Sequence, residues 1–202
     1  SFGRHIKSTY QADFPAMSIP TPGQENSQPL VGPIVISEIM YHPQFEDDAE
    51  YIKLRNITTQ PVTLQQFNPV TNTNVPWRFN DGIDFIFPQN TTIPAGGCLV
   101  ITKNTALFTS VYGSLPANVQ LLSPFANSTG LSNGGEELQL VKPQYKNDGT
   151  LDFITVDYLE YDDHLPWPEE PDGDGKALDR ITDSDYANDP ANFHAQNPNP
   201  GY

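Results

Sequence analysis

Residues 50–56, EYIKLRN, are the stretch that indicates the fold most directly. In an extended chain Ile52 and Leu54 lie on one face, while Lys53 and Arg55 lie on the other. Alternation with a period of two is typical of a strand that covers a core with one face only. The stretch therefore predicts a β-strand of a sandwich or barrel.

Similar runs occur on both sides of this stretch, separated by Gly, Pro or Asn. They are PIVISEIM (33–40), IDFIFP (83–88), CLVITK (98–103), EELQLVK (136–142) and DFITVDYLEY (152–161). In the second of them, Ile83, Phe85 and Phe87 share one face. Many short strands with frequent turn signals predict an all-β sandwich.

One short helix is expected at NTALFTSVYG (104–113). Asn104 is a suitable N-cap residue, and Gly113 suits a helix end. Apolar side chains share one face of this helix: Leu107, Phe108, Val111 and Tyr112. The 20 prolines and 14 glycines of the chain oppose longer helices.

Charge and motifs narrow the function. The chain carries 25 acidic and 10 basic residues, a net charge of −15, which repels nucleic acid and anionic membranes. No apolar run approaches the roughly 18 residues of a membrane-spanning helix. Cys98, the single cysteine, opens an apolar run and is expected to be buried. The four histidines lack zinc-ligand spacing, and no G-x-S-x-G or phosphate-binding loop occurs, so no catalytic site is expected.

The two ends of the sequence carry a related pattern. At an offset of 176 residues, Arg4, Ser8 and Tyr10 match Arg180, Ser184 and Tyr186, and after a two-residue gap PTPG (20–23) matches PNPG (198–201). We therefore expect residues 1–23 to be the closing segment of a preceding, similar domain. Residues 24–32 would be a linker, and residues 33–202 the domain proper. Such a closing strand could also pair with the open edge of a second copy and give a strand-exchanged dimer.

Several segments, in this order, resemble the lamin-tail domain in its bacterial form. They are VISEIMYHP (35–43), EYIKLRNITTQPVTL (50–64), IPAGGCLVITKN (93–104), GLSNGGEELQLV (130–141), PWPEEPDGDGKALDRI (166–181) and DPANFHA…NPG (189–201). The resemblance implies an immunoglobulin-like β-sandwich without catalytic activity. It also implies a module of a large exported protein, placed outside the cell or on its surface.

The expected function is therefore structural: adhesion, spacing or ligand presentation, with neighbouring domains of the same chain or a surface protein as partners. A carbohydrate-binding module beside a polysaccharide-active enzyme is the alternative, with bound calcium possible. A small hydrolase is the third hypothesis, since paired carboxylates could cleave a glycosidic bond.

Two sets of residues are candidate ligand sites. Acids that could offer oxygen ligands to calcium are Asp162, Asp163, Glu169, Asp172 and Asp174. They do not form an EF-hand loop, and a solvated turn is the alternative interpretation. Trp77 and Trp167 could stack on sugar rings, with Trp167 favoured because it lies between two prolines. Packing in the core is the alternative for both tryptophans.

Overall fold

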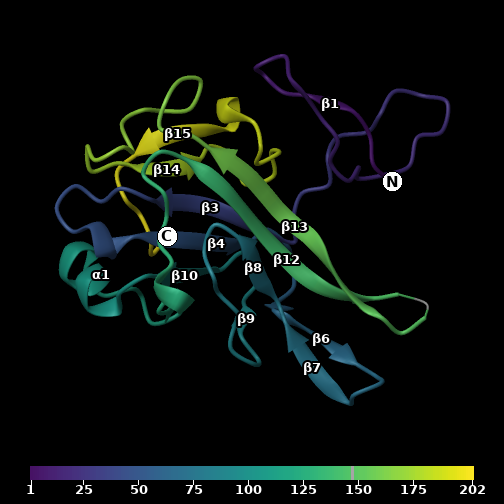
Figure 1. The fold of residues 1–202 in the computed structure, drawn as a ribbon, viewed down its shortest axis with the longest axis horizontal. Helices are drawn as coiled ribbons and strands as arrows, with labels where there is room; N and C mark the ends of the chain where they lie inside the picture. Colours follow the sequence, from purple (N-terminus) through teal and green to yellow (C-terminus); the bar gives the residue numbers. More distant parts are fainter. Residues whose placement is uncertain (147) are drawn as a thin grey trace.

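The computed structural model describes residues 1–146 and 148–202, and most of the regular structure is β-strand (Figure 1). The strands are β1 (His5–Ile6), β2 (Ala12–Asp13), β3 (Ile34–Met40), β4 (Tyr51–Asn56), β5 (Val62–Thr63), β6 (Gln65–Asn68), β7 (Thr73–Pro76), β8 (Arg78–Asp81), β9 (Thr92–Ile93), β10 (Cys98–Thr102), β11 (Gln120–Leu122), β12 (Glu136–Tyr145), β13 (Leu151–Tyr161), β14 (Ala177–Arg180) and β15 (Phe193–Gln196). The helix α1 spans Thr105–Tyr112, and 3₁₀ turns span Asp47–Ala49, Ala126–Ser128 and Pro190–Asn192.

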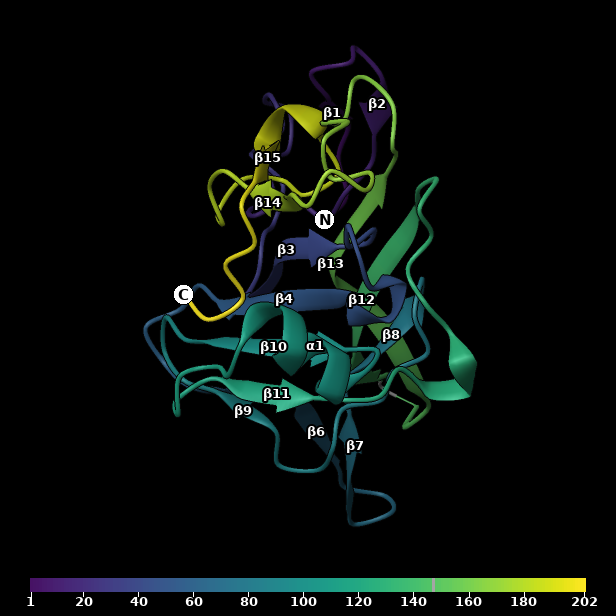
Figure 2. The ribbon, with the colours of Figure 1, turned by 90° about the vertical axis from the view of Figure 1, so that its left-hand side faces the viewer.

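Two sheets form the body of the domain (Figure 2). In the described residues the larger sheet has the order β11-β10-β4-β3-β14-β15, and the smaller has the order β13-β12-β8. Neighbouring strands in these sheets are antiparallel except β10 and β11, which are parallel. Short ladders join β5 to β9 and β6 to β7. The all-β fold with one short helix is confirmed.

The core lies between the two sheets and explains the alternation in β4. Ile52 and Leu54 are fully buried there, against residues such as Leu138 and Leu140 of β12. The opposite face of β4 is also covered, because Lys53 on that face is buried. The C-terminal segment lies over that face and supplies hydrogen-bond acceptors to the ammonium group of Lys53. The predicted strand is confirmed at β4, and at Lys53 both of its faces are covered.

The helix forms as predicted. The Asn104 side chain accepts hydrogen bonds from the backbone N–H groups of Ala106 (3.0 Å) and Leu107 (3.2 Å). Gly113 ends the helix at φ 80°, a conformation that favours glycine. Phe108 is buried in a second, smaller core under the larger sheet, together with Cys98 and Val100.

The predicted strand at 83–88 is wrong, although its alternation is right. Ile83, Phe85 and Phe87 are buried, but the segment forms only an isolated bridge between Arg78 and Ile86. Gly82, at φ 86°, turns the chain so closely past Leu138 that a Cβ atom there would clash with the Leu138 side chain. The regular strand of this region is β8, which precedes that turn.

The N-terminal segment forms its own small unit. β1 and β2 pair with each other, outside both main sheets. This N-terminal hairpin (residues 2–16) lies beside the closing hairpin formed by β14 and β15, at the end of the sandwich where β13 finishes (Figure 1). Within the described residues no helix is long and apolar enough to cross a membrane.

Candidate functional site

The N-terminal hairpin is held against the loop between β14 and β15 by two carboxylates. The first is Asp189, which belongs to that loop and is buried. It accepts hydrogen bonds from the Ser8 backbone N–H (2.7 Å) and from the Ser8 hydroxyl. It also accepts from the Ala191 N–H and so caps the 3₁₀ turn that leads into β15. Asp189 therefore joins the hairpin to the structure that precedes β15.

The second carboxylate, Asp13, belongs to the hairpin and faces the opposite way. It accepts hydrogen bonds from the Tyr186 hydroxyl (2.6 Å) and from the Asn188 side-chain amide (2.9 Å). The His5 ring meets the Tyr186 ring edge to face, with centroids 5.2 Å apart. Each side of the contact therefore offers one carboxylate to donors on the other side.

These contacts affect proton binding. Partial burial by itself raises the pKa of Asp13, but the hydrogen bonds from Tyr186 and Asn188 outweigh it and lower the pKa below its usual value. Burial raises the pKa of the Tyr186 hydroxyl, and the neighbouring Asp13 carboxylate raises it further. Tyr186 is therefore a hydrogen-bond donor and Asp13 an acceptor across the neutral pH range.

A cleft of about 580 Å³ separates the hairpin from the end of the sandwich. On one side Lys7, Thr9 and Gln11 line it, and on the other Glu136, Glu160 and Trp167 are among the lining residues. The lining is about half polar, and one lysine faces several carboxylates. The cleft is therefore a gap between two bodies in contact rather than an apolar ligand pocket.

The closing hairpin is integrated into the sandwich. β14 pairs with β3 at Leu178 and Asp179, and the Leu178 side chain is fully buried in the core. The Arg180 guanidinium is buried and forms an ion pair with Asp157 of β13 at 2.8 Å. Asp157 also accepts from the Ile36 backbone N–H at 2.8 Å. This pair ties β14 to β3 and to the opposite sheet.

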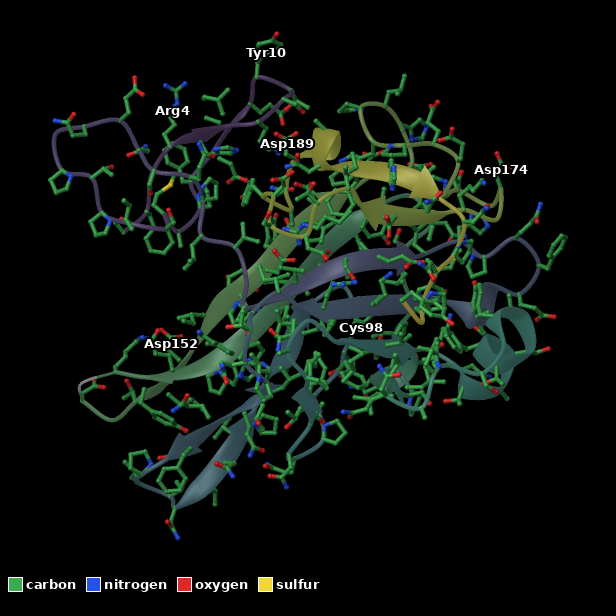
Figure 3. The ribbon with its side chains drawn as sticks, turned by 180° about the vertical axis from the view of Figure 1, so that it is seen from behind. Arg4, Tyr10, Cys98, Asp152, Asp174 and Asp189 are labelled. Atoms are coloured by element: carbon green, nitrogen blue, oxygen red, sulfur yellow. The ribbon has the colours of Figure 1, made fainter. Side chains whose placement is uncertain are left out.

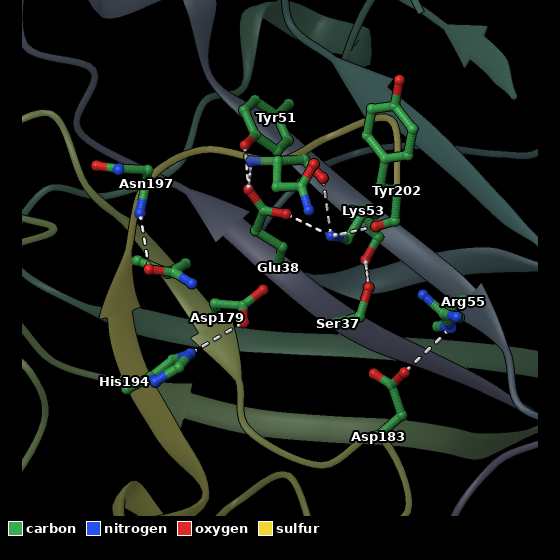
Figure 4. Close-up of polar contacts among 12 residues, drawn as sticks. Ser37, Glu38, Tyr51, Lys53, Arg55, Asp179, Asp183, His194, Asn197 and Tyr202 are labelled. Carbon is green, nitrogen blue, oxygen red and sulfur yellow. Dashed lines mark hydrogen bonds and ion pairs between the residues drawn. The ribbon is translucent and has the colours of Figure 1, made fainter. Parts of the chain in front are cut away.

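The C-terminal tail covers a second buried polar cluster, formed by Glu38, Tyr51 and Lys53 on the outer face of β3 and β4 (Figure 4). Lys53 Nζ contacts Glu38 Oε2 at 2.5 Å and donates to the backbone oxygens of Asn199 (3.0 Å) and Tyr202 (3.2 Å). Glu38 accepts from the Tyr51 hydroxyl and from the Asn199 N–H. The tail therefore completes the hydrogen bonds of two buried charges.

A comparison with known families shows which family the chain belongs to. The family model described as Lamin Tail Domain matches residues 27–162, from within the predicted linker (24–32) to the residue after β13. This chain belongs to the lamin-tail domain family. The fold of that family is immunoglobulin-like, and its domains are typically non-catalytic. No curated protein matches the chain.

Both tryptophans proposed for sugar binding are packed inside this lamin-tail domain. Trp77 and Trp167 are each about 5% exposed and belong to the main core. The Trp167 ring packs against Phe193 of β15, with centroids 5.4 Å apart. This burial favours the packing alternative over a sugar-binding platform for both rings, although Trp167 also lines the cleft beside the hairpin.

The acids proposed for calcium separate into small groups. Asp162 and Asp163 lie together with His164, whose Nδ1 contacts a carboxylate oxygen of each, at 3.4 and 2.6 Å. Asp172 pairs instead with His42 at 2.5 Å. Among the described residues, only the first group brings three potential metal ligands together, and Glu169, Asp172 and Asp174 are not part of it. A calcium ion needs roughly six to eight oxygens, far more than this group supplies.

Sequence reasoning missed the residues that make the interface. Asp13 and Asp189 were not singled out, although they obey the same offset as the matched arginines and tyrosines. Cys98 behaves as predicted: it is buried, and burial raises the pKa of its thiol, which disfavours the reactive thiolate.

Proposed function

We propose that this lamin-tail domain is a non-catalytic structural module that holds a preceding domain in a fixed orientation within a larger exported protein. The observation that supports this most strongly is the docked N-terminal hairpin. Its reciprocal contacts, Ser8 with Asp189 and Asp13 with Tyr186 and Asn188, define both position and rotation. A flexible tether needs neither.

The linker is also tied down. The segment after the hairpin folds back on itself through backbone hydrogen bonds from Leu30 to Ala16 (2.7 Å) and from Ser18 to Gln28 (3.0 Å). The Ser27 hydroxyl accepts from the Ile19 N–H and donates to its carbonyl oxygen. A free Gly/Ser-type linker would sample a broad range of distances. This segment instead supports a rigid spacer.

An exported or cell-surface location is part of the same proposal. It rests on the resemblance to bacterial lamin-tail segments, and the net charge of −15 favours solubility. Adhesion to a surface protein remains compatible with a spacer role.

The carbohydrate-binding alternative is tested separately. We expect no retention of the protein on a panel of insoluble and immobilised polysaccharides, with calcium or with chelator. Saturable retention would replace the spacer proposal with a sugar-binding one, and calcium dependence would direct attention to Asp162 and Asp163.

Double electron–electron resonance tests the spacer role directly. In a Cys98→Ala background, spin labels are placed at two exposed positions, Phe14→Cys on the hairpin and Ser110→Cys on α1. We expect one narrow distance distribution, because the docking contacts hold the hairpin still. The double variant Ser8→Ala/Asp13→Ala should broaden it.

The matched control is Glu25→Ala, an exposed acid in the same segment, which should leave the distribution narrow. A broad distribution in the protein without Ser8→Ala/Asp13→Ala would contradict the proposal, because the hairpin would then be a flexible tether.

A further inference from the structure

Side chains in the N-terminal segment (1–23) correspond in sequence to side chains in the closing segment (177–201). In the closing segment they pack on the sandwich, whereas most of their N-terminal counterparts do not. Arg180 is buried against Asp157, whereas its counterpart Arg4 is exposed. Among the described residues no carboxylate forms an ion pair with Arg4. Figure 3 shows the Arg4 and Tyr10 side chains pointing away from the sandwich.

The apolar and aromatic positions repeat this contrast. Leu178 is fully buried in the core, while Phe2, at the same offset, is 81% exposed. Tyr186 is partly buried and hydrogen-bonded, while Tyr10 is 91% exposed. An aromatic residue exposed to this degree has lost the main contribution that it makes to stability, which is the burial of its ring.

The proline-containing tails show the same difference. In Pro198–Gly201 the tail lies over the buried cluster at Lys53, and Gly201 is so close to Pro116 that a Cβ atom would clash. In Pro20–Gly23 the related sequence is mostly exposed, and a Cβ atom on Gly23 would meet nothing within 4 Å. Gly201 is thus required by its close packing on Pro116, whereas Gly23 has open space around it and is favoured only by its positive φ.

Met17 is the exception, because it is buried, but its neighbours belong to the N-terminal segment. Met17 corresponds to Phe193, and both are buried. Phe193 packs on Trp167 of the sandwich, whereas the Met17 side chain lies beside Gly3 of the N-terminal segment and belongs to neither core cluster of the sandwich. Its burial therefore belongs to the N-terminal segment and not to the core of the sandwich.

The contact between the two segments extends the correspondence. Asp13 and Asp189 are at the same offset of 176 residues, and each accepts hydrogen bonds from the other segment. The hairpin thus meets the closing hairpin of this domain as one copy of a motif meets another. Such a head-to-tail contact repeats along a chain of domains.

We propose that residues 1–23 close a second lamin-tail sandwich, the preceding domain of the same polypeptide. This inference rests on the proposed spacer function and names its partner. Arg4 would enter that sandwich and pair with a carboxylate placed as Asp157 is here. Pro20–Gly23 would cover a lysine–glutamate pair placed as Lys53 and Glu38 are here.

The partner is identified by this chemistry. A sandwich that accepts the segment needs an open edge at the strand equivalent to β3, because β14 pairs there. It also needs a buried carboxylate for Arg4, because a buried charge is tolerated only when it is paired. Both features belong to the lamin-tail body and not to an arbitrary neighbour.

A tandem fusion tests the proposal. Residues 24–176 are joined directly in front of the full chain 1–202, so that Ser1 follows Lys176 in the place of Ala177. An epitope at the N-terminus reports the first body. Two reference fusions are compared with it. In the first, both bodies carry their own residues 177–202. In the second, the first body has no closing segment.

We expect the first body to resist limited proteolysis as it does when it carries residues 177–202. Arg4→Ala should then lower its melting temperature by about 10 °C while leaving the second body unchanged. In the chain 1–202 alone, the same substitution should have no measurable effect. If the first body is as protease-sensitive as the fusion without a closing segment, the proposal is overturned. If the spin-label distance distribution in residues 1–202 is narrow in that case, the spacer function still holds, and only the assignment of its partner as a second lamin-tail sandwich is wrong.

Discussion

The N-terminal hairpin and the closing hairpin carry related sequences but stand in opposite environments. β14 joins the larger sheet through β3 and places Leu178 and Arg180 in the core. β1 pairs only with β2, and a two-stranded hairpin of this kind is marginal without further contacts. The comparison shows that the pattern alone does not decide burial. What decides it is whether a sheet edge and a charge partner are available opposite the strand.

Replacing Arg180 or its counterpart Arg4 by alanine should show the largest difference in the free energy of unfolding. Arg180→Ala leaves Asp157 buried without its cation, and we expect the free energy of unfolding to fall by about 3–5 kcal/mol. Arg4→Ala removes an exposed side chain and should change it by less than about 0.5 kcal/mol. Urea denaturation followed by tryptophan fluorescence measures both. Equal effects would mean that the two segments do not differ in the way described here.

Replacing Phe193 or its counterpart Met17 should show a somewhat smaller difference in global stability. Phe193→Ala opens a cavity beside Trp167 and should cost about 3 kcal/mol of global stability. Met17→Ala affects only the N-terminal segment, so the global unfolding curve should stay in place while protease sensitivity before residue 30 rises. A global loss from Met17→Ala would show that the segment is part of the cooperative core.

The hydrogen bond between the hairpins should contribute less. In a double-mutant cycle of Tyr186→Phe and Asp13→Ala, we expect a coupling of about 1 kcal/mol. The readout is the local opening free energy of the hairpin from amide hydrogen exchange, since global unfolding does not report it. Ser132→Ala serves as the control, because it lies outside this contact. Additive effects in the cycle would argue that the two side chains do not interact in solution.

Acid should release the hairpin gradually. The folded-state pKa of Asp13 is lowered from its ordinary value of 3.8, so the docked state binds its proton less readily than the free hairpin does. The contribution of Asp13 is therefore complete well above pH 3.8 and is lost as the pH falls through the lowered pKa. The amide resonance of Phe14, whose N–H donates to Asp13, should report the step, and Asp13→Asn should abolish it.

The sequence was sufficient for the body of the fold. Alternation predicted β4, and strand-like runs bounded by Gly, Pro or Asn predicted β3, β10, β12 and β13. It failed at 83–88, where buried residues alternate without a regular ladder. Nothing in the sequence indicated that Lys53 is buried, since its burial depends on a tail nearly 150 residues away in the sequence.

The site was harder to predict than the fold. Trp77 and Trp167 were ambiguous because a tryptophan can form a platform or a core, and only packing separates the two. The interface acids, Asp13 and Asp189, acquire their role from contacts between the chain ends. The repeated pattern at the two ends gave the signal, and geometry was needed to show which copy is used in this domain.

Hydrogen exchange of the intact chain, resolved by peptide, tests the central claim most directly. It compares the protein with its Ser8→Ala/Asp13→Ala variant. We expect peptides from residues 1–30 to exchange faster in the variant, while peptides from β3, β4 and β14 keep their protection. Equal exchange of residues 1–30 in both proteins would contradict the account, because the side chains of Ser8 and Asp13 would then not hold the hairpin in place.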